Sequence, residues 1–234
     1  MESMSSKPAI GFYYGKGNLK NLANYETVIL QPEHYSAQEI KQLAKISKAY
    51  AYISLTEDSA KSGPWQLKER NLNWDTAYVD IGSSLWHEHI LKQAASYFAQ
   101  GFQGLFLDTL DAIDKYPEQR NNLLQLICKL KELAKNKALI ANRGFSLMPE
   151  LQNYVSAIVF EGFSCIWAND GSYRSLKADE LAWTKKIAKE LQASGLDIYA
   201  LDYAEAEYLK EFAKKRANSY GFISLISNRE LTKI

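Results

Sequence analysis

The chain has 234 residues, of which 47% are hydrophobic and 24% are charged, an ordinary globular mixture that excludes a disordered chain. Lys and Arg number 28 and Asp and Glu number 27, so the formal charge of +1 gives no strong attraction to nucleic acid or anionic lipid. The two cysteines allow at most one disulfide, which excludes a disulfide-stapled scaffold.

The first residues, Met1–Pro8, are short and polar and lack the apolar core of a signal peptide. We expect residues 1–7 to form a flexible tail on a single domain that spans residues 1–234. No apolar run approaches the length of a membrane span. As read, the chain is expected to be cytoplasmic, although a secreted or periplasmic location stays open if a leader has been trimmed.

Eight short apolar runs recur along the chain, and none alternates strictly between apolar and polar residues. Such runs are typical of strands that are buried on both faces by flanking helices. The eight predicted strands are Ala9–Tyr14, Thr27–Leu30, Ala49–Leu55, Leu105–Leu107, Ala138–Ala141, Ala157–Phe160, Ile198–Leu201 and Phe222–Ile226.

Amphipathic stretches separate the strands. The first opens with Ser36 and Glu39 in the spacing of a capping box, and the second ends before Gly101, a residue typical of helix C-termini. The predicted helices are Ser36–Ala49, Trp86–Gln100, Glu118–Lys135, Ala178–Ala193 and Ala204–Ala217.

Eight strands that alternate with helices in about this length predict an α/β fold, specifically a closed (β/α)8 barrel of the TIM type. A ninth apolar run, Ala77–Ile81, also reads as a strand, and we place it in a long excursion from Thr56 to Ser84 outside the barrel. The alternative is a doubly wound open sheet. The spacing of the early glycines does not match the phosphate-binding turn of that fold, which weakens this reading.

Polar residues follow the predicted strands, at the end where barrels carry their functional residues. Several carboxylates on one rim cannot all ionise without cost, so one carboxyl is expected to hold a raised pKa. A glycosidase needs such a pair, although aldolases and metal enzymes also line barrels with acids. The ionisable residues at seven of the eight strand ends are Glu33, His34, Glu57, Asp108, Asp111, Arg143, Glu161, Asp202 and Arg229.

Other chemistries find little support. His34, His87 and His89 are the only histidines, and His87 and His89 are expected to be exposed on different helix faces, so no metal and no other cofactor is predicted. The nucleophile elbow of serine hydrolases is absent. None of the predicted strands contains the lysine that a Schiff-base aldolase needs.

Aromatic residues favour a sugar ligand, because their faces stack on the C–H surfaces of sugar rings and attract cations. Trp183 lies inside a predicted helix, where we expect packing. For the tryptophans of the loops, ligand contact and packing are equally open. The aromatic residues at strand ends are Tyr13, Tyr14, Phe163 and Tyr203, and those in loops are Trp65, Trp74 and Trp167.

Seven stretches in chain order resemble the polygalactosaminidase-type glycoside hydrolases, family 114 and its relatives. The resemblance covers essentially the whole chain, although the segment Ser224–Asn228 lacks the Trp and Asp associated with the last strand of that family. The matching stretches are GFYYG at Gly11–Gly15, VILQPEH at Val28–His34, AYISLTE at Ala51–Glu57, GFQGLFLDTLD at Gly101–Asp111, NRGFSLMPE at Asn142–Glu150, VFEGF at Val159–Phe163 and IYALDY at Ile198–Tyr203.

The resemblance implies a (β/α)8 barrel that cleaves an α-1,4-linked polymer of galactosamine and N-acetylgalactosamine, of the kind found in biofilm exopolysaccharides. It also implies that Asp108 and Glu161 are the catalytic carboxylates. Glu161 has apolar neighbours, so we assign it as the acid/base and Asp108 as the nucleophile or base. The further residues expected to bind substrate are Tyr14, Glu57, Asp111, Asn142, Arg143, Phe163, Asp202 and Tyr203.

Three functions therefore stay open: an endo-acting glycoside hydrolase, a catalytically weak carbohydrate-binding barrel, and a barrel aldolase or lyase that acts on a small molecule. An acidic, aromatic-rich mouth suits a cationic amino-sugar polymer best. The expected partner is a polysaccharide substrate, with no nucleic acid and no membrane. Oligomeric state and acetylation preference do not follow from the sequence.

Overall fold

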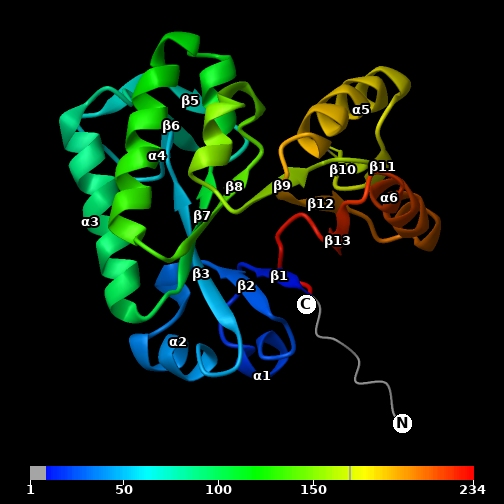
Figure 1. Cartoon of the computed structure of the whole chain (residues 1–234), viewed down its shortest axis with the longest axis horizontal. Coiled ribbons are helices and arrows are strands. Elements are labelled where there is room, and N and C mark those ends of the chain that lie inside the picture. The colour runs from blue at the N-terminus through cyan, green and yellow to red at the C-terminus, as the bar shows by residue number, and fades with distance from the viewer. Residues whose placement is uncertain (1–8, 169) are drawn as a thin grey trace.

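The structure is a computed structural model that describes residues 9–168 and 170–234. The tail expected over residues 1–7 lies outside the described residues. Figure 1 shows the elements in chain order, with strands in the interior and helices around them.

The described part of the chain forms a sheet of eight parallel strands, in the order β1-β2-β3-β7-β8-β9-β12-β13. All eight predicted strands are present, and the sheet curls into a nearly closed (β/α)8 barrel, which confirms the predicted fold. The strands are β1 (Ile10–Tyr13), β2 (Thr27–Leu30), β3 (Lys48–Ser54), β7 (Gly104–Asp108), β8 (Ala138–Asn142), β9 (Ala157–Glu161), β12 (Asp197–Tyr203) and β13 (Ile223–Ser227).

The barrel closes between its first and last strands through the C-terminal segment. No ladder pairs β1 with β13 among the described residues. Instead, the backbone N–H of Tyr14 donates to the carbonyl of Leu231 at 2.8 Å. Leu231 is 5% exposed and packs among the side chains of the barrel interior, so the segment after β13 fills the seam.

Helices cover the outside of the sheet, as the amphipathic pattern predicts. Ser36 and Glu39 form the expected capping box, and Gly101 ends its helix in the left-handed conformation. The first predicted helix ends early because β3 already begins at Lys48. The helices are α1 (Leu19–Leu22), α2 (Ala37–Leu43), α3 (Ser84–Gln100), α4 (Arg120–Ala134), α5 (Ala178–Gln192) and α6 (Glu207–Ser219), with short 3-10 helices η1 (Pro32–His34), η2 (Leu110–Asp114), η3 (Pro117–Gln119), η4 (Phe145–Leu147) and η5 (Glu150–Asn153).

Two small antiparallel sheets lie outside the barrel. The excursion between β3 and α3 forms β4 (Glu57–Asp58), β5 (Gln66–Asn71) and β6 (Thr76–Val79), paired in the order β4-β6-β5. The extra strand predicted near Ala77–Ile81 is therefore β6, outside the barrel as expected. The second sheet pairs β10 (Cys165–Trp167) with β11 (Tyr173–Ser175), between β9 and α5.

Side chains of the barrel strands alternate between two cores. One set fills the barrel interior, and the other packs between the sheet and the helices. The alternation decides which residues at the strand ends can reach the mouth of the barrel. Interior side chains include Phe12, Ile29, Tyr50, Phe106, Ile140, Val159 and Leu201.

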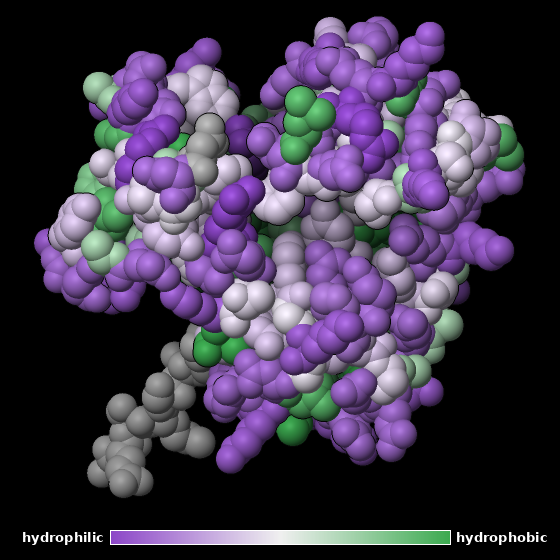
Figure 2. Space-filling model, turned by 180° about the vertical axis from the view of Figure 1, so that it is seen from behind, coloured by the Kyte–Doolittle hydropathy of each residue, from purple (hydrophilic) through white to green (hydrophobic). Residues whose placement is uncertain are grey.

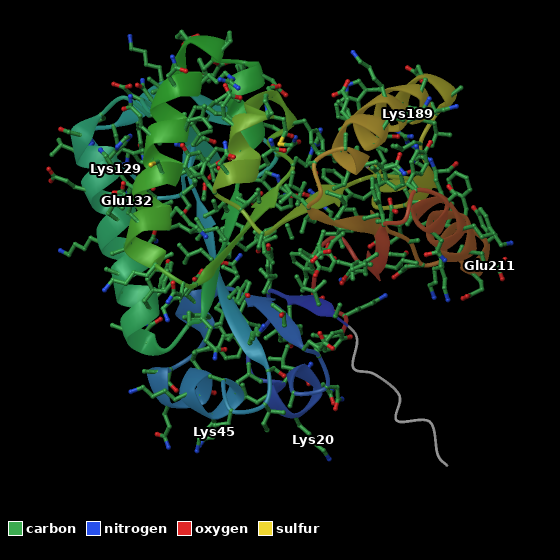
Figure 3. All side chains as sticks on the ribbon, viewed as in Figure 1. Lys20, Lys45, Lys129, Glu132, Lys189 and Glu211 are labelled. Carbon is green, nitrogen blue, oxygen red and sulfur yellow. The ribbon has the colours of Figure 1, made fainter. Side chains whose placement is uncertain are left out.

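Charged residues occupy the outer surface of the helix layer. Lys189 of α5 and Glu211 of α6 point away from the barrel in Figure 3. The face in Figure 2 is mostly hydrophilic, with small separate hydrophobic spots, and it is hollowed between its two upper lobes. Among the described residues, no helix is long and apolar enough to cross a membrane.

Candidate active site

Two carboxylates meet at the mouth of the barrel. Asp108 ends β7 and Glu161 ends β9, with Asn142 at the end of the intervening strand β8. Asn142 Nδ2 donates to Asp108 Oδ1 at 2.8 Å and to Glu161 Oε2 at 2.7 Å. Because both oxygens bond to one nitrogen, they lie no more than 5.5 Å apart.

The backbone turns sharply after each of these three residues. Thr109, Arg143 and Gly162 all have left-handed conformations, with φ of 65°, 53° and 66°. This conformation is uncommon for residues with a Cβ, and strained backbone of this kind is concentrated at functional sites. The three turns end the strands at the mouth of the barrel, where Asn142 contacts both carboxylates.

Burial and charge act together on Glu161. Desolvation raises the pKa of its carboxyl, and the neighbouring Asp108 raises it further. Hydrogen bonds from Asn142 and from the hydroxyl of Tyr203, which lies 2.5 Å from Oε1, oppose this shift. The net effect raises the pKa, so Glu161 has the property of a proton donor.

Two tyrosines complete the floor of the site. Burial and the charge of Asp108 raise the pKa of Tyr14 and Tyr52 well above 10, which keeps both hydroxyls protonated. The nearby Asp108 is thus one of the groups that keep Tyr52 protonated. Tyr52 was not predicted, although its position two residues after the interior side chain of Tyr50 places it on the same face of β3.

The excursion sheet brings Glu57 to the site. Glu57 is 9% exposed, and its carboxylate accepts hydrogen bonds from Thr76 Oγ1 at 2.5 Å and from Asn71 Nδ2 at 3.1 Å. Both partners lie on the excursion strands, so only the folded excursion holds this carboxylate in place.

Asp111 and Arg143 form an ion pair at the rim. Arg143 Nε lies 2.8 Å from Asp111 Oδ2, and Asp111 Oδ1 accepts from the N–H of Gly144. Burial raises the pKa of Asp111, and Arg143 opposes this shift. The pair joins the loops that follow β7 and β8 and fixes the position of the guanidinium.

Asp202 and Phe163 do not line the site, contrary to the expectation from sequence. Asp202 lies between Leu201 and Tyr203, which face the interior, so its side chain points outward and accepts from the N–H groups of Ser164 and Cys165. Burial raises its pKa to about 6. Phe163 is fully buried in the outer core, 5.0 Å from the ring of Phe160.

A cavity of about 760 Å³ lies over Asp108, Asn142 and Glu161 and is open to solvent. Its size is typical of small-molecule sites. Of the sequence-predicted residues, those that line it are Tyr14, Glu57, Asp108, Asp111, Asn142, Arg143, Glu161 and Tyr203.

The loop tryptophans have different roles. Trp65 packs against Trp86 and donates to Asp58, so it is structural. Trp74 is 57% exposed and lines the cavity. The guanidinium of Arg229 lies 3.9 Å from the ring of Trp167 and 5.3 Å from that of Trp74, which connects the two small sheets across the cavity.

The histidines contribute no metal centre within residues 9–168 and 170–234, where no group of three or more potential ligands gathers. The expectation that His87 is exposed is wrong. Its side chain is 7% exposed, because it lies under the excursion, where its Nε2 lies 2.8 Å from the carbonyl of Ile81. His89 is exposed, as expected.

A (β/α)8 barrel with two carboxylates within 5.5 Å, under a cavity open to solvent, has the architecture of a glycoside hydrolase. The sequence profile of the glycoside-hydrolase family GH114 matches residues 28–234. The chain belongs to this family and is a glycoside hydrolase.

Solved structures agree with this assignment. The glycoside hydrolase domain of PelA from Pseudomonas aeruginosa is 30% identical and superposes with a TM-score of 0.86, covering 97% of this chain and 96% of that one. Ega3 of Aspergillus fumigatus, solved in complex with galactosamine, is 15% identical and shares the fold, with a TM-score of 0.73 over 97% of this chain and 92% of that one.

A protein of Deinococcus radiodurans described as uncharacterized is 24% identical over all of this chain and 86% of its own length.

Proposed function

We propose that the protein is an endo-acting hydrolase of an α-1,4-linked polymer of galactosamine and N-acetylgalactosamine, and that Asp108 and Glu161 carry out the reaction. The pair of carboxylates bridged by Asn142 is the observation that carries this proposal. The similarity to the hydrolase domain of PelA and the galactosamine bound to Ega3 support the substrate class.

In this mechanism Glu161, whose pKa is raised by burial and by Asp108, gives its proton to the glycosidic oxygen as the bond breaks. Asp108 attacks the anomeric carbon and forms a glycosyl-enzyme ester. A water then attacks that carbon, the Glu161 carboxylate accepts the water's proton, and Asp108 leaves. Asn142 holds both carboxylates through its Nδ2, and its buried Oδ1 has no hydrogen-bond partner among the described residues.

The short separation of the carboxylates predicts retention of anomeric configuration. Retaining enzymes hold the two carboxyl groups about 5–5.5 Å apart, whereas inverting enzymes need about 6.5–9.5 Å to admit a water between them. The limit of 5.5 Å set by the 2.8 and 2.7 Å bonds to Asn142 fits the first class. Proton NMR of the first product tests this: α-anomer is expected, and initial release of β-anomer would mean inversion.

The proposed function is tested by incubating the purified chain with a partly deacetylated α-1,4-galactosamine polymer and following the release of oligosaccharides. Asp108→Asn and Glu161→Gln are each expected to lower turnover by at least about 1,000-fold while leaving the melting temperature near that of the wild type. Asp197→Asn and Glu132→Gln make the same changes at exposed positions outside the cavity and serve as controls. A chelator is expected to leave the rate unchanged, since two carboxylates supply both roles.

The same experiment separates the other functions. A chain that binds the polymer but releases no oligosaccharide would be a carbohydrate-binding barrel. Near wild-type turnover by either amide variant would refute the assignment of the pair.

A further inference from the structure

A second cavity of about 370 Å³ lies beside the first. Arg143 and Glu161 line both cavities, so the second one begins at the proposed acid/base. From there it extends between the end of β9 and the first two turns of α5, where Asp179 and Trp183 line it. We call this second cavity the α5 groove. The two cavities therefore adjoin each other at Arg143 and Glu161.

Trp183 presents an aromatic surface to the α5 groove. Its ring packs edge-on against Phe145 and Phe160, with centroid separations of 6.0 and 6.3 Å, and the guanidinium of Arg143 lies 5.6 Å from its centre. The residue nevertheless remains 45% exposed. The packing expected from sequence is therefore only part of its environment, because the side chain is also partly exposed where it lines the groove. A fixed, exposed indole is suited to stack on a sugar ring.

The α5 groove also contains a carboxylate that forms no hydrogen bond or ion pair in the described part of the chain. Glu180 accepts two hydrogen bonds from Arg174, at 2.8 and 3.0 Å, which with the N–H of Lys177 hold its pKa at about 2. Arg143 is paired with Asp111. Asp179, next to Glu180 on the first turn of α5, is exposed and has no side-chain hydrogen bond or ion pair within the described part of the chain. The charge of Asp179 contributes to the raised pKa of Arg174, but the guanidinium of Arg174 donates to Glu180, so the carboxylate of Asp179 keeps its hydrogen-bonding capacity.

We propose that the α5 groove is a second sugar-binding subsite, in which Trp183 stacks on a hexosamine ring adjacent to the one cleaved and Asp179 binds the ammonium of a residue that is not acetylated. This subsite rests on the proposed function, since it extends the same substrate along the same mouth. The stacking acts on acetylated and free amino sugars alike. The carboxylate acts only on the charged one, because an acetamido group is neutral.

Two variants test the subsite separately. Binding of an α-1,4-galactosamine tetramer and of its fully acetylated form is measured by calorimetry, and hydrolysis of the polymer is compared with that of an aryl galactosaminide too short to reach the groove. Trp183→Ala is expected to weaken binding of both tetramers by about 3- to 10-fold. Asp179→Asn is expected to weaken binding of the free amine form alone, by about 2- to 5-fold. Both variants should cleave the aryl galactosaminide at the wild-type rate.

Tyr208→Ala, at an exposed aromatic of α6, and Asp197→Asn, at an exposed carboxylate, are the matched controls and line neither cavity. If the polymer is cleaved but tetramer affinity does not depend on Trp183, the subsite is refuted and the proposed function stands. If tetramers bind in a Trp183-dependent way but no polymer is cleaved, the proposed function fails, and the groove is a sugar-binding site that takes no part in cleavage. If there is neither cleavage nor Trp183-dependent binding, both are refuted.

Discussion

At the scale of single residues, the protonation of Glu161 is set by opposing contacts. Burial and Asp108 raise its pKa, while donors from Asn142 and Tyr203 lower it. Both donors bond to the carboxylate oxygens and therefore stabilise the ionised form. In the proposed mechanism, the same side chain donates a proton in the first step and, once ionised, accepts one in the second.

Removing the hydroxyl of Tyr203 should change the pH dependence in a defined direction. Tyr203→Phe deletes a bond to the ionised form, so the pKa of Glu161 rises further. A general acid works only below its pKa, and the alkaline limb of the kcat profile is expected to move to higher pH. The control is Tyr199→Phe, on the same strand and the same face but deeper in the barrel. An alkaline limb that stays in place or moves to lower pH in Tyr203→Phe would contradict the assignment of Glu161.

At the scale of elements, the excursion sheet supports the site from outside the barrel. Thr109 Oγ1 accepts from the N–H groups of Leu55 and Thr56, which joins the start of the excursion to the turn after Asp108. Thr56 donates through Oγ1 to the carbonyl of Thr109 at 2.5 Å. The excursion is thus anchored directly beside the proposed catalytic pair.

Loosening Glu57 should affect binding more than chemistry. Thr76→Val keeps the shape of the side chain but removes a hydrogen-bond donor to the buried carboxylate of Glu57. This loss is expected to lower the free energy of unfolding by about 1–3 kcal/mol. We expect KM for the polymer to rise by about 3- to 10-fold with kcat within about twofold of the wild type, because Glu57 lines the cavity without contacting the catalytic pair. Lys68→Ala, at an exposed position of β5, is the control. An unchanged KM in Thr76→Val would show that Glu57 does not contact substrate.

At the scale of the whole molecule, the barrel depends on its C-terminal segment. The segment is held by Asn228, whose Oδ1 accepts from the N–H groups of Thr232 and Lys233. This turn places Leu231 inside the barrel, where it also lines the cavity, and its carbonyl pairs with Tyr14. Closure and the shape of the site are therefore set by the same residues.

Truncating the side chain of Leu231 should destabilise the fold. Leu231→Ala leaves a cavity in the barrel interior and is expected to lower the free energy of unfolding by about 2–5 kcal/mol. Ile223→Ala, at a position that is 39% exposed on β13, should lower it by less than about 1 kcal/mol. Urea denaturation of both variants makes the comparison. Equal losses would show that the seam is not filled by Leu231.

Local patterns in the sequence determine the strands and helices, because each barrel unit is a short apolar run followed by an amphipathic helix. They also bring Asp108, Asn142 and Glu161 to one rim, because the carboxyl ends of parallel strands lie together. Side chains alternate between the two faces of a strand. Applied to the sequence, this rule predicts that Tyr203 faces the barrel interior while Asp202 faces outward, and that Tyr52 faces the interior with Tyr50. The error at Asp202 arose because a continuous apolar run hides that alternation.

Only the tertiary structure decided the remaining features, because they join segments that are far apart along the chain. The partners of Glu57 come from two strands of the excursion, and the separation of Asp108 from Glu161 depends on barrel curvature and on Asn142. The position of Trp183 inside a helix predicts only that its side chain packs against neighbours. Its open face exists because α5 and β9 leave a groove between them, and no local pattern specifies the space between two elements.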